Sequence, residues 1–262
     1  MRYIIITKKT IIICGAVILA IALFFCIFKV NEEFVIANTK NKLLPIYSVQ
    51  RNDKKIAISF DAAWGNEDTE QLISILKRFN AKATFFVVGE WVDKFPNSVK
   101  ALADAGHDIE NHSDTHPHMP KLSHTDMIKE INDCNNKIQN ITKRRPQLFR
   151  PPYGDYDNNL IKAVSEQGMF CIQWDVDSLD WKNKTAFEIE NKVVGKVNDG
   201  SVVLFHNAAK NTPEALPDIL EKLTQKGYEF VTVSELIYLD NYYIDHTGRQ
   251  HVNPITSLSS FN

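Results

Sequence analysis

Short apolar runs alternate with amphipathic stretches along most of this chain. The run at 55–60 is bounded by charged residues and is typical of a buried strand. The stretch at 69–79 carries apolar residues at helical spacing and predicts a helix. The same alternation predicts strands at 55–60, 83–88, 107–110, 147–149, 169–174, 201–205 and 229–231. It predicts helices at 69–79, 98–105, 125–141, 158–167, 186–197, 213–225 and 233–238.

This order of elements indicates the fold class. Strands that alternate with helices are typical of parallel sheets with helical crossovers. The expected strands are apolar on both faces, as a sheet covered on two sides requires. A closed α/β barrel and an open, doubly wound sheet both fit this pattern. No glycine-rich phosphate loop follows the first strand, which disfavours nucleotide binding.

The beginning of the chain has a different character. The apolar run at 11–28 approaches the roughly 20 residues that cross a bilayer as a helix, and basic residues precede it. Glu32 and Glu33 follow it, which predicts a cytoplasmic N-terminus and an extracytoplasmic remainder at the cell membrane. A cleaved signal peptide, with a late site at 35–37, is the alternative. The predicted parts are a cytoplasmic stub at 1–9, an anchor at 10–28, a linker at 29–53, a folded domain at 54–238 and a polar tail at 239–262.

Composition narrows the classes of partner. The formal charge is −2 and the isoelectric point about 6.4, so a nucleic-acid surface is not expected. The part after the apolar run suits one domain of α/β barrel size, and we expect a monomer. Cys134 and Cys171 could pair outside the cell, but the sequence gives no distance between them.

Ionisable side chains follow most of the expected strands. They are Asp61, His112, His116, Arg150, Asp175, Asp177 and His206. In parallel α/β barrels, catalytic side chains converge at the carboxyl ends of the strands. Each has a structural explanation when taken alone: Asp61 as a helix cap, Arg150 in a surface ion pair, His206 as a core histidine. Together they favour a site, because a charge beside a buried strand is costly unless it is paired or used.

His112 and His116 are candidate metal ligands. In a helical turn their spacing would place both imidazoles on one face, where they could share a divalent cation. The chain has eight histidines, so such a pair also arises by chance, and a surface turn with solvated histidines is the alternative.

Five short motifs occur in one order along residues 54–238. They are Ser59-Phe60-Asp61-Ala62-Ala63-Trp64-Gly65, His112-Ser113-Asp114-Thr115-His116, Arg150-Pro151-Pro152-Tyr153-Gly154, Asp177-Ser178-Leu179-Asp180-Trp181 and Leu204-Phe205-His206. In these motifs the chain resembles the polysaccharide deacetylases with a NodB-homology domain, carbohydrate esterase family 4. The residues at 243–250 and the Ala-Trp-Gly variant of the first motif resemble a subgroup from sporulating Gram-positive bacteria.

The resemblance implies a fold and an activity. The fold is a distorted (β/α) barrel of seven or eight strands with a groove for a glycan. The activity is metal-assisted hydrolysis of N-acetyl groups on amino sugars of a cell-wall polysaccharide. His112 and His116 would hold the cation, most often zinc, which polarises the carbonyl and acidifies its bound water.

The resemblance also implies roles for the other residues. Asp61 would be the general base, and Arg150 would orient it. His206 would be the general acid, kept protonated by Asp180. The backbone N–H of Tyr153 would stabilise the oxyanion. Trp181 and Leu204 would shape the acetyl pocket, with ordinary core packing as the alternative.

One position departs from the family pattern. The usual second aspartate, the third metal ligand, is Ala62 here. Two histidines make a poor zinc site, since zinc normally has three protein ligands and a water. Asp61, Asp114, Glu110 or extra water could compensate; otherwise the metal is weak or absent. A non-catalytic glycan-binding protein on the same fold is therefore the second hypothesis, although the retained base, arginine and acid favour an enzyme.

Overall fold

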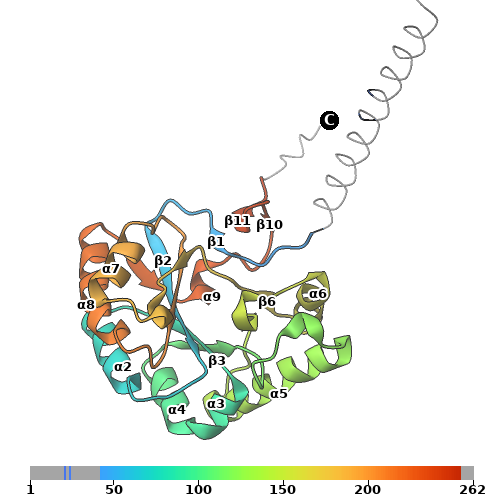
Figure 1. The fold of residues 1–262 in the computed structure, drawn as a ribbon, viewed down its shortest axis with the longest axis horizontal. Helices are drawn as coiled ribbons and strands as arrows, with labels where there is room; N and C mark the ends of the chain where they lie inside the picture. The colour runs from blue at the N-terminus through green and yellow to red at the C-terminus, as the bar shows by residue number, and fades with distance from the viewer. Residues whose placement is uncertain (1–20, 22–23, 25–41, 255–262) are drawn as a thin grey trace, which may run out of the picture. The chain divides into compact units, whose positions relative to one another are not determined.

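The main feature of the fold is an eight-stranded parallel sheet (Figure 1). This computed structural model describes residues 42–254 together with Ile21 and Phe24. The strands are β2 (Lys55–Ala62), β3 (Ala83–Val87), β4 (Asp108–Asn111), β5 (Leu148–Phe149), β6 (Phe170–Cys171), β7 (Val176–Asp177), β8 (Val202–His206) and β9 (Glu229–Val231). Their order is β6-β5-β4-β3-β2-β8-β7, and β9 pairs with the start of β2. The terminal strands β6 and β7 do not pair, so the sheet forms a half-barrel, and the predicted parallel α/β architecture is confirmed.

Helices connect these strands. They are α2 (Thr69–Arg78), α3 (Gly89–Lys94), α4 (Pro96–Asp104), α5 (His124–Thr142), α6 (Asn158–Glu166), α7 (Ala186–Val194), α8 (Thr212–Gln225) and α9 (Val233–Leu236). Short 3₁₀ turns are η1 (Met119–Lys121), η2 (Pro152–Gly154) and η3 (Asp180–Lys182). Thr185 and Thr232 begin α7 and α9 with capping boxes, which explains where these helices start. The short helix α3 was not predicted, because its six residues span less than two turns of periodic pattern.

Strand β2 separates two apolar layers by strict alternation of its side chains. Ile56, Ile58, Phe60 and Ala62 pack in the cluster shared with the helices, where Phe60 stacks on Phe85 at a centroid distance of 4.8 Å. Ala57 packs in a second cluster, while Ser59 and Asp61 bond Arg150. Asp61 and Ala62 therefore face opposite sides of the sheet, because neighbouring residues of a strand point to opposite faces.

Residues 44–53 belong to the folded domain, although the sequence placed them in the linker. Ile46 bridges to Ile172 beside β6, and it is 1% exposed. Val49 donates its N–H to the carbonyl of Gly200 at 2.9 Å, just before β8. Gly200 has φ +81°, and a Cβ there would lie 1.8 Å from the carbonyl oxygen of Val49. The segment thus reaches from β6 to the start of β8, and Ile46 and Val49 gain burial only through that tertiary contact.

The beginning of the expected polar tail is also ordered. Strands β10 (Tyr242–Ile244) and β11 (Arg249–Val252) form a hairpin, and β11 pairs with β1 (Ser48–Val49). The periodicity of these strands is too short to be recognised, and their pairing depends on residues about 200 positions earlier in the chain.

Two further expectations concern the anchor and the cysteines. Apart from Ile21 and Phe24, the anchor predicted at 10–28 lies outside the described residues. Among the residues that the structure does describe, no helix has the length and apolar character to cross a membrane.

Cys134 and Cys171 are both buried as free thiols, in different apolar clusters, so they form no disulfide.

Candidate active site

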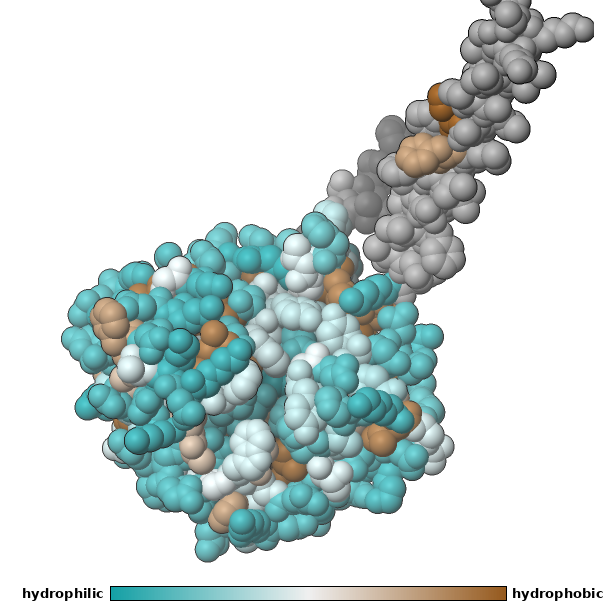
Figure 2. All heavy atoms as spheres, in the orientation of Figure 1, coloured by the Kyte–Doolittle hydropathy of each residue, from teal (hydrophilic) through white to brown (hydrophobic). Residues whose placement is uncertain are grey.

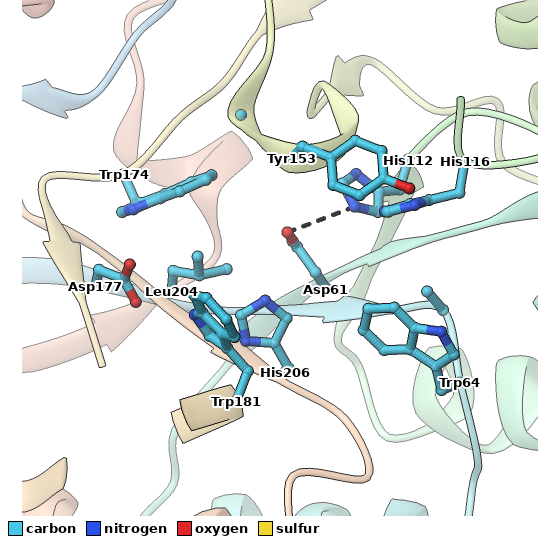
Figure 3. Close-up of a pocket in the computed structure, with 12 residues that line it drawn as sticks. Asp61, Trp64, His112, His116, Tyr153, Trp174, Asp177, Trp181, Leu204 and His206 are labelled. Atoms are coloured by element: carbon cyan, nitrogen blue, oxygen red, sulfur yellow. Dashed lines mark ion pairs between the residues drawn. The ribbon is translucent and has the colours of Figure 1, made fainter. Parts of the chain in front are cut away.

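The carboxyl ends of the central strands surround a pocket of about 460 Å³ (Figure 3). Its ionisable lining residues are Asp61, His112, His116, Asp177 and His206. Its aromatic lining residues are Trp64, Tyr153, Trp174 and Trp181. On the face seen in Figure 2, apolar side chains are mostly scattered among hydrophilic ones. The structure thus brings together most of the ionisable residues that the sequence places after successive strands.

Arg150 and Asp175 do not line the pocket: Arg150 reaches the site through its bond to Asp61, whereas Asp175 does not reach it. The Asp175 carboxylate accepts hydrogen bonds from the Ser201 hydroxyl and the Val202 N–H, both at 2.8 Å. It therefore stabilises the backbone at the beginning of β8 and does not line the pocket.

Asp61 and Arg150 form a buried ion pair at the base of the pocket. Arg150 is fully buried, and its Nη1 donates to Asp61 Oδ1 at 2.8 Å. Its Nη2 donates to the Ser59 hydroxyl at 2.9 Å and to the Gln173 carbonyl at 3.2 Å. Burial is the largest single influence and would raise the pKa of Asp61, but the neighbouring charges and the hydrogen bond from Arg150 together outweigh it, with the charge of Arg150 first among them, so this pKa lies below its ordinary value. Asp61 is therefore held as an oriented carboxylate.

His112 and His116 approach each other without a helix. They lie in the loop after β4, where Ser113 (φ +67°) and His116 (φ +60°) adopt left-handed conformations. Their ring centroids are 5.0 Å apart. The expectation of a helical turn is thus wrong, because two reversals of the backbone, not an i,i+4 helical register, bring the rings together.

The surroundings of the two imidazoles keep them neutral. Nδ1 of His112 lies 2.7 Å from the Arg150 carbonyl oxygen, an arrangement that leaves Nε2 3.5 Å from Asp61 Oδ2. Burial lowers the pKa of His112 and lowers that of His116 to about 4. Neutral imidazoles are the form that binds metal ions.

The other candidate ligands do not complete a metal site. The Asp114 carboxylate contacts the Lys137 ammonium at 2.6 Å, and Glu110 accepts the N–H groups of Gln147 and Leu148. Ala62 packs in the apolar cluster between the sheet and the helices, and the next residue, Ala63, lines the pocket. Neither methyl group can bind a metal. Within residues 42–254, no three His, Cys, Asp or Glu side chains are grouped to hold a metal. The residues present therefore do not fit a three-ligand zinc site, and neither Asp114 nor Glu110 compensates for Ala62.

His206 and Asp180 form the second polar pair. Asp61 and His206 are register partners on neighbouring strands, which places the two pairs side by side. His206 Nδ1 lies 2.8 Å from Asp180 Oδ1, and the His206 N–H donates to Oδ2. Burial opposes the charged imidazole, but the hydrogen bond and charge of Asp180 outweigh it, so the pKa of His206 is raised. His206 can therefore carry a proton into the pocket.

Thr212 is a supporting residue that the sequence did not reveal. It is fully buried at the start of α8, and its hydroxyl donates to Asp180 Oδ2 at 2.7 Å. A threonine at the first turn of a helix has a common structural explanation, so only the fold shows its contact with Asp180.

The rim of the pocket is aromatic. Tyr153 has φ +60° and is 61% exposed, and the residues that the structure describes offer no acceptor for its N–H. Its ring lies 4.5 Å from that of His116. Trp181 is 55% exposed on the opposite side, and Leu204 forms part of the floor (Figure 3). Trp64 was not selected from the sequence; its carbonyl accepts the indole N–H of Trp91, which ties down the loop after β2.

Comparisons with known proteins agree with this geometry. The polysaccharide deacetylase family model matches residues 48–172. The chain is 36% identical to the peptidoglycan-N-acetylmuramic acid deacetylase PdaC of Bacillus subtilis, over 72% of this chain and 40% of that protein. It thus spans less than half the length of that relative.

Two solved structures extend the comparison. The Bc1960 peptidoglycan N-acetylglucosamine deacetylase has a TM-score of 0.71 at 35% identity, covering 73% of this chain and 92% of that one. BA3943 of Bacillus anthracis, a CE4 family pseudoenzyme, has a TM-score of 0.71 at 33% identity, covering 79% and 72%. The match in fold, sequence and ordered motifs confirms the resemblance: this chain belongs to the polysaccharide deacetylase family, carbohydrate esterase family 4.

Proposed function

We propose that this protein is a hydrolase that removes N-acetyl groups from amino sugars of a cell-wall glycan. The observation that carries the proposal is the pair of dyads, Asp61–Arg150 and His206–Asp180, on neighbouring strands in one pocket. The lowered pKa of Asp61 favours an ionised carboxylate and the raised pKa of His206 favours a protonated imidazole, the forms in which a base and an acid begin the reaction. The relatives named as peptidoglycan deacetylases support the substrate class.

The reaction needs one proton taken and one proton given. Asp61 accepts a proton from a water molecule while the oxygen of that water attacks the acetyl carbonyl carbon. The Tyr153 N–H donates to the developing oxyanion. His206 then donates its proton to the amide nitrogen, the carbon–nitrogen bond breaks, and acetate and a free amine leave. Trp181 and Leu204 bound the space for the acetyl group.

A divalent metal is the part of this proposal that the site supports least. His112 and His116 offer two nitrogen donors, and zinc held by them alone would need water for the rest of its shell. For this reason the acid–base residues, not a metal, carry the proposed reaction.

A second candidate function is glycan binding without catalysis. Two features favour binding without catalysis: the alanine at position 62, and the lack of a third metal ligand beside His112 and His116 among the described residues. Similarity to BA3943, which is described as a pseudoenzyme, points the same way. The exposed aromatic rings of the rim would serve binding as well as catalysis.

Acetate release separates the two functions. The full-length protein is incubated with N-acetylglucosamine oligomers or peptidoglycan, with zinc, with other divalent metals and with a chelator. We expect acetate from the wild type and a large loss in Asp61→Asn and His206→Ala. His124→Ala, an exposed histidine paired with Glu166, is the matched control and should keep full activity. Glycan binding without acetate under every condition would favour the second function.

The location of the protein is a separate proposal. The apolar run at 11–28 and its flanking charges support an anchor, with the folded domain outside the membrane. Protease added to intact protoplasts should remove the domain; complete protection would contradict the orientation.

The oligomeric state is also a proposal. We expect a monomer, so gel filtration in detergent should give the mass of one chain.

A further inference from the structure

Asp177 is a pocket carboxylate to which the reaction above assigns no task. It ends β7, pairs in register with Leu204 on β8 and lines the pocket. Figure 3 shows it on the side of the pocket away from His112 and His116. It thus lies where a bound sugar would extend, and away from the attacking water beside Asp61.

The orientation of the Asp177 side chain is fixed. Oδ1 accepts the N–H of Leu179 at 2.8 Å, and Leu179 itself has φ +58°. Among the described residues, Oδ2 has no hydrogen-bond partner. One oxygen of the carboxylate therefore holds the loop, and the other is available to a ligand.

The walls beside Asp177 suit an uncharged sugar. Trp174 and Trp181 line the same end of the pocket (Figure 3) and offer apolar ring faces to the C–H groups of a pyranose. No lysine or arginine side chain is among the residues described as lining the pocket. The Lys182 ammonium lies 4.7 Å from the centre of the Trp181 ring, next to the pocket but outside its lining. The cation among the described lining residues is the protonated His206, which is already paired with Asp180, so an anionic substituent beside Asp177 would meet an uncompensated negative charge.

We propose that Asp177 selects an uncharged N-acetyl amino sugar at the reacting position. Its Oδ2 accepts a hydrogen bond from a sugar hydroxyl and repels a carboxylate in the same place. In a cell-wall glycan this selects N-acetylglucosamine over an N-acetylmuramic acid whose lactyl carboxylate is free. The inference rests on the proposed function for its substrate class.

The test compares two glycans on four proteins. The glycans are an N-acetylglucosamine oligomer and an oligomer of the same length made only of N-acetylmuramic acid with free lactyl carboxylates. The proteins are the full-length wild type, Asp177→Asn, Asp218→Asn and Lys182→Met. Asparagine keeps the oxygen that accepts the Leu179 N–H and removes the charge. Asp218 is exposed on α8, so its variant has the same change in net charge away from the pocket.

We expect the wild type to favour the neutral oligomer by about 10-fold in both kcat/KM and Kd, and Asp177→Asn to reduce this ratio to about 3-fold or less. Asp218→Asn and Lys182→Met should leave the ratio unchanged. A wild type that favours the anionic glycan, or an unchanged ratio in Asp177→Asn, would overturn the inference. If no protein releases acetate but the Kd ratio follows the expected pattern, the selection by Asp177 stands and the proposed hydrolysis fails.

Discussion

The buried Asp61–Arg150 pair gives a sharp test of the site's energetics. Arg150→Met keeps much of the side-chain volume but removes all three hydrogen bonds of the guanidinium. Asp61, 6% exposed, would then be a buried carboxylate without its cation. Breaking a buried pair from one side costs about 3–5 kcal/mol, mostly because the remaining charge is uncompensated. We expect Arg150→Met to lower the free energy of unfolding by that amount.

The double variant isolates the cause. Asp61→Asn removes the anion that compensates the buried Arg150 cation, although the amide oxygen can still accept its hydrogen bond, and should cost about 2–3 kcal/mol. In Asp61→Asn/Arg150→Met no unpaired charge remains, so the combined loss should be about 3 kcal/mol and not the sum of the two. The coupling free energy is then at least about 2 kcal/mol, which is typical of residues in direct contact.

Urea unfolding of the full-length protein, followed by tryptophan fluorescence in metal-free buffer, measures these values. Arg144→Met is the control, because the Arg144 side chain is 82% exposed and its loss should change the stability by less than about 0.5 kcal/mol. A double variant whose loss equals the sum of the single losses within about 0.5 kcal/mol would refute the coupling. The two charges would then be compensated by other groups.

Three further predictions concern acid–base groups. Asp61→Asn and His206→Ala should each lower acetate release by about 10²–10⁴-fold while staying folded by circular dichroism, and near-normal turnover would show a misassigned role. Asp180→Asn removes the charge that raises the pKa of His206, so the loss of activity at alkaline pH should begin at lower pH; an unmoved pH profile would contradict this. Burial lowers the pKa of His107 to about 4, so its contribution to stability is complete above about pH 6.5 and is lost as the pH falls through 4, by about 3 kcal/mol. Urea titrations at several pH values should show a weaker acid dependence in His107→Asn, and equal dependence in both proteins would exclude His107 as its source.

The strands and helices of the domain were predictable because each signal is local. Buried parallel strands are apolar on both faces, and the covering helices show their apolar stripe within three or four turns. The ordered motifs also identified the family. The sequence therefore determined the α/β architecture, the end of the sheet that carries the site, and the residues Asp61, Arg150, His206 and Asp180.

Contacts between distant segments were decided only by the tertiary structure. Ile46 and Val49 look like part of a polar linker until β6, β8 and β11 provide surfaces that bury them. The histidine pair looks helical by its spacing, but left-handed residues in a loop bring the two rings together.

Only the tertiary structure shows that Asp114 and Glu110 do not complete a metal site with His112 and His116. From the sequence, Asp114 and Glu110 lie near His112 and could each replace the missing aspartate. In the fold, Asp114 contacts Lys137, and Glu110 is bonded to the backbone at the start of β5. Nearness along a chain does not fix the direction of a side chain, because strand alternation and loop geometry send neighbours to opposite faces. The sequence determined which chemical groups this site can contain, and the tertiary structure decided which of them face the pocket.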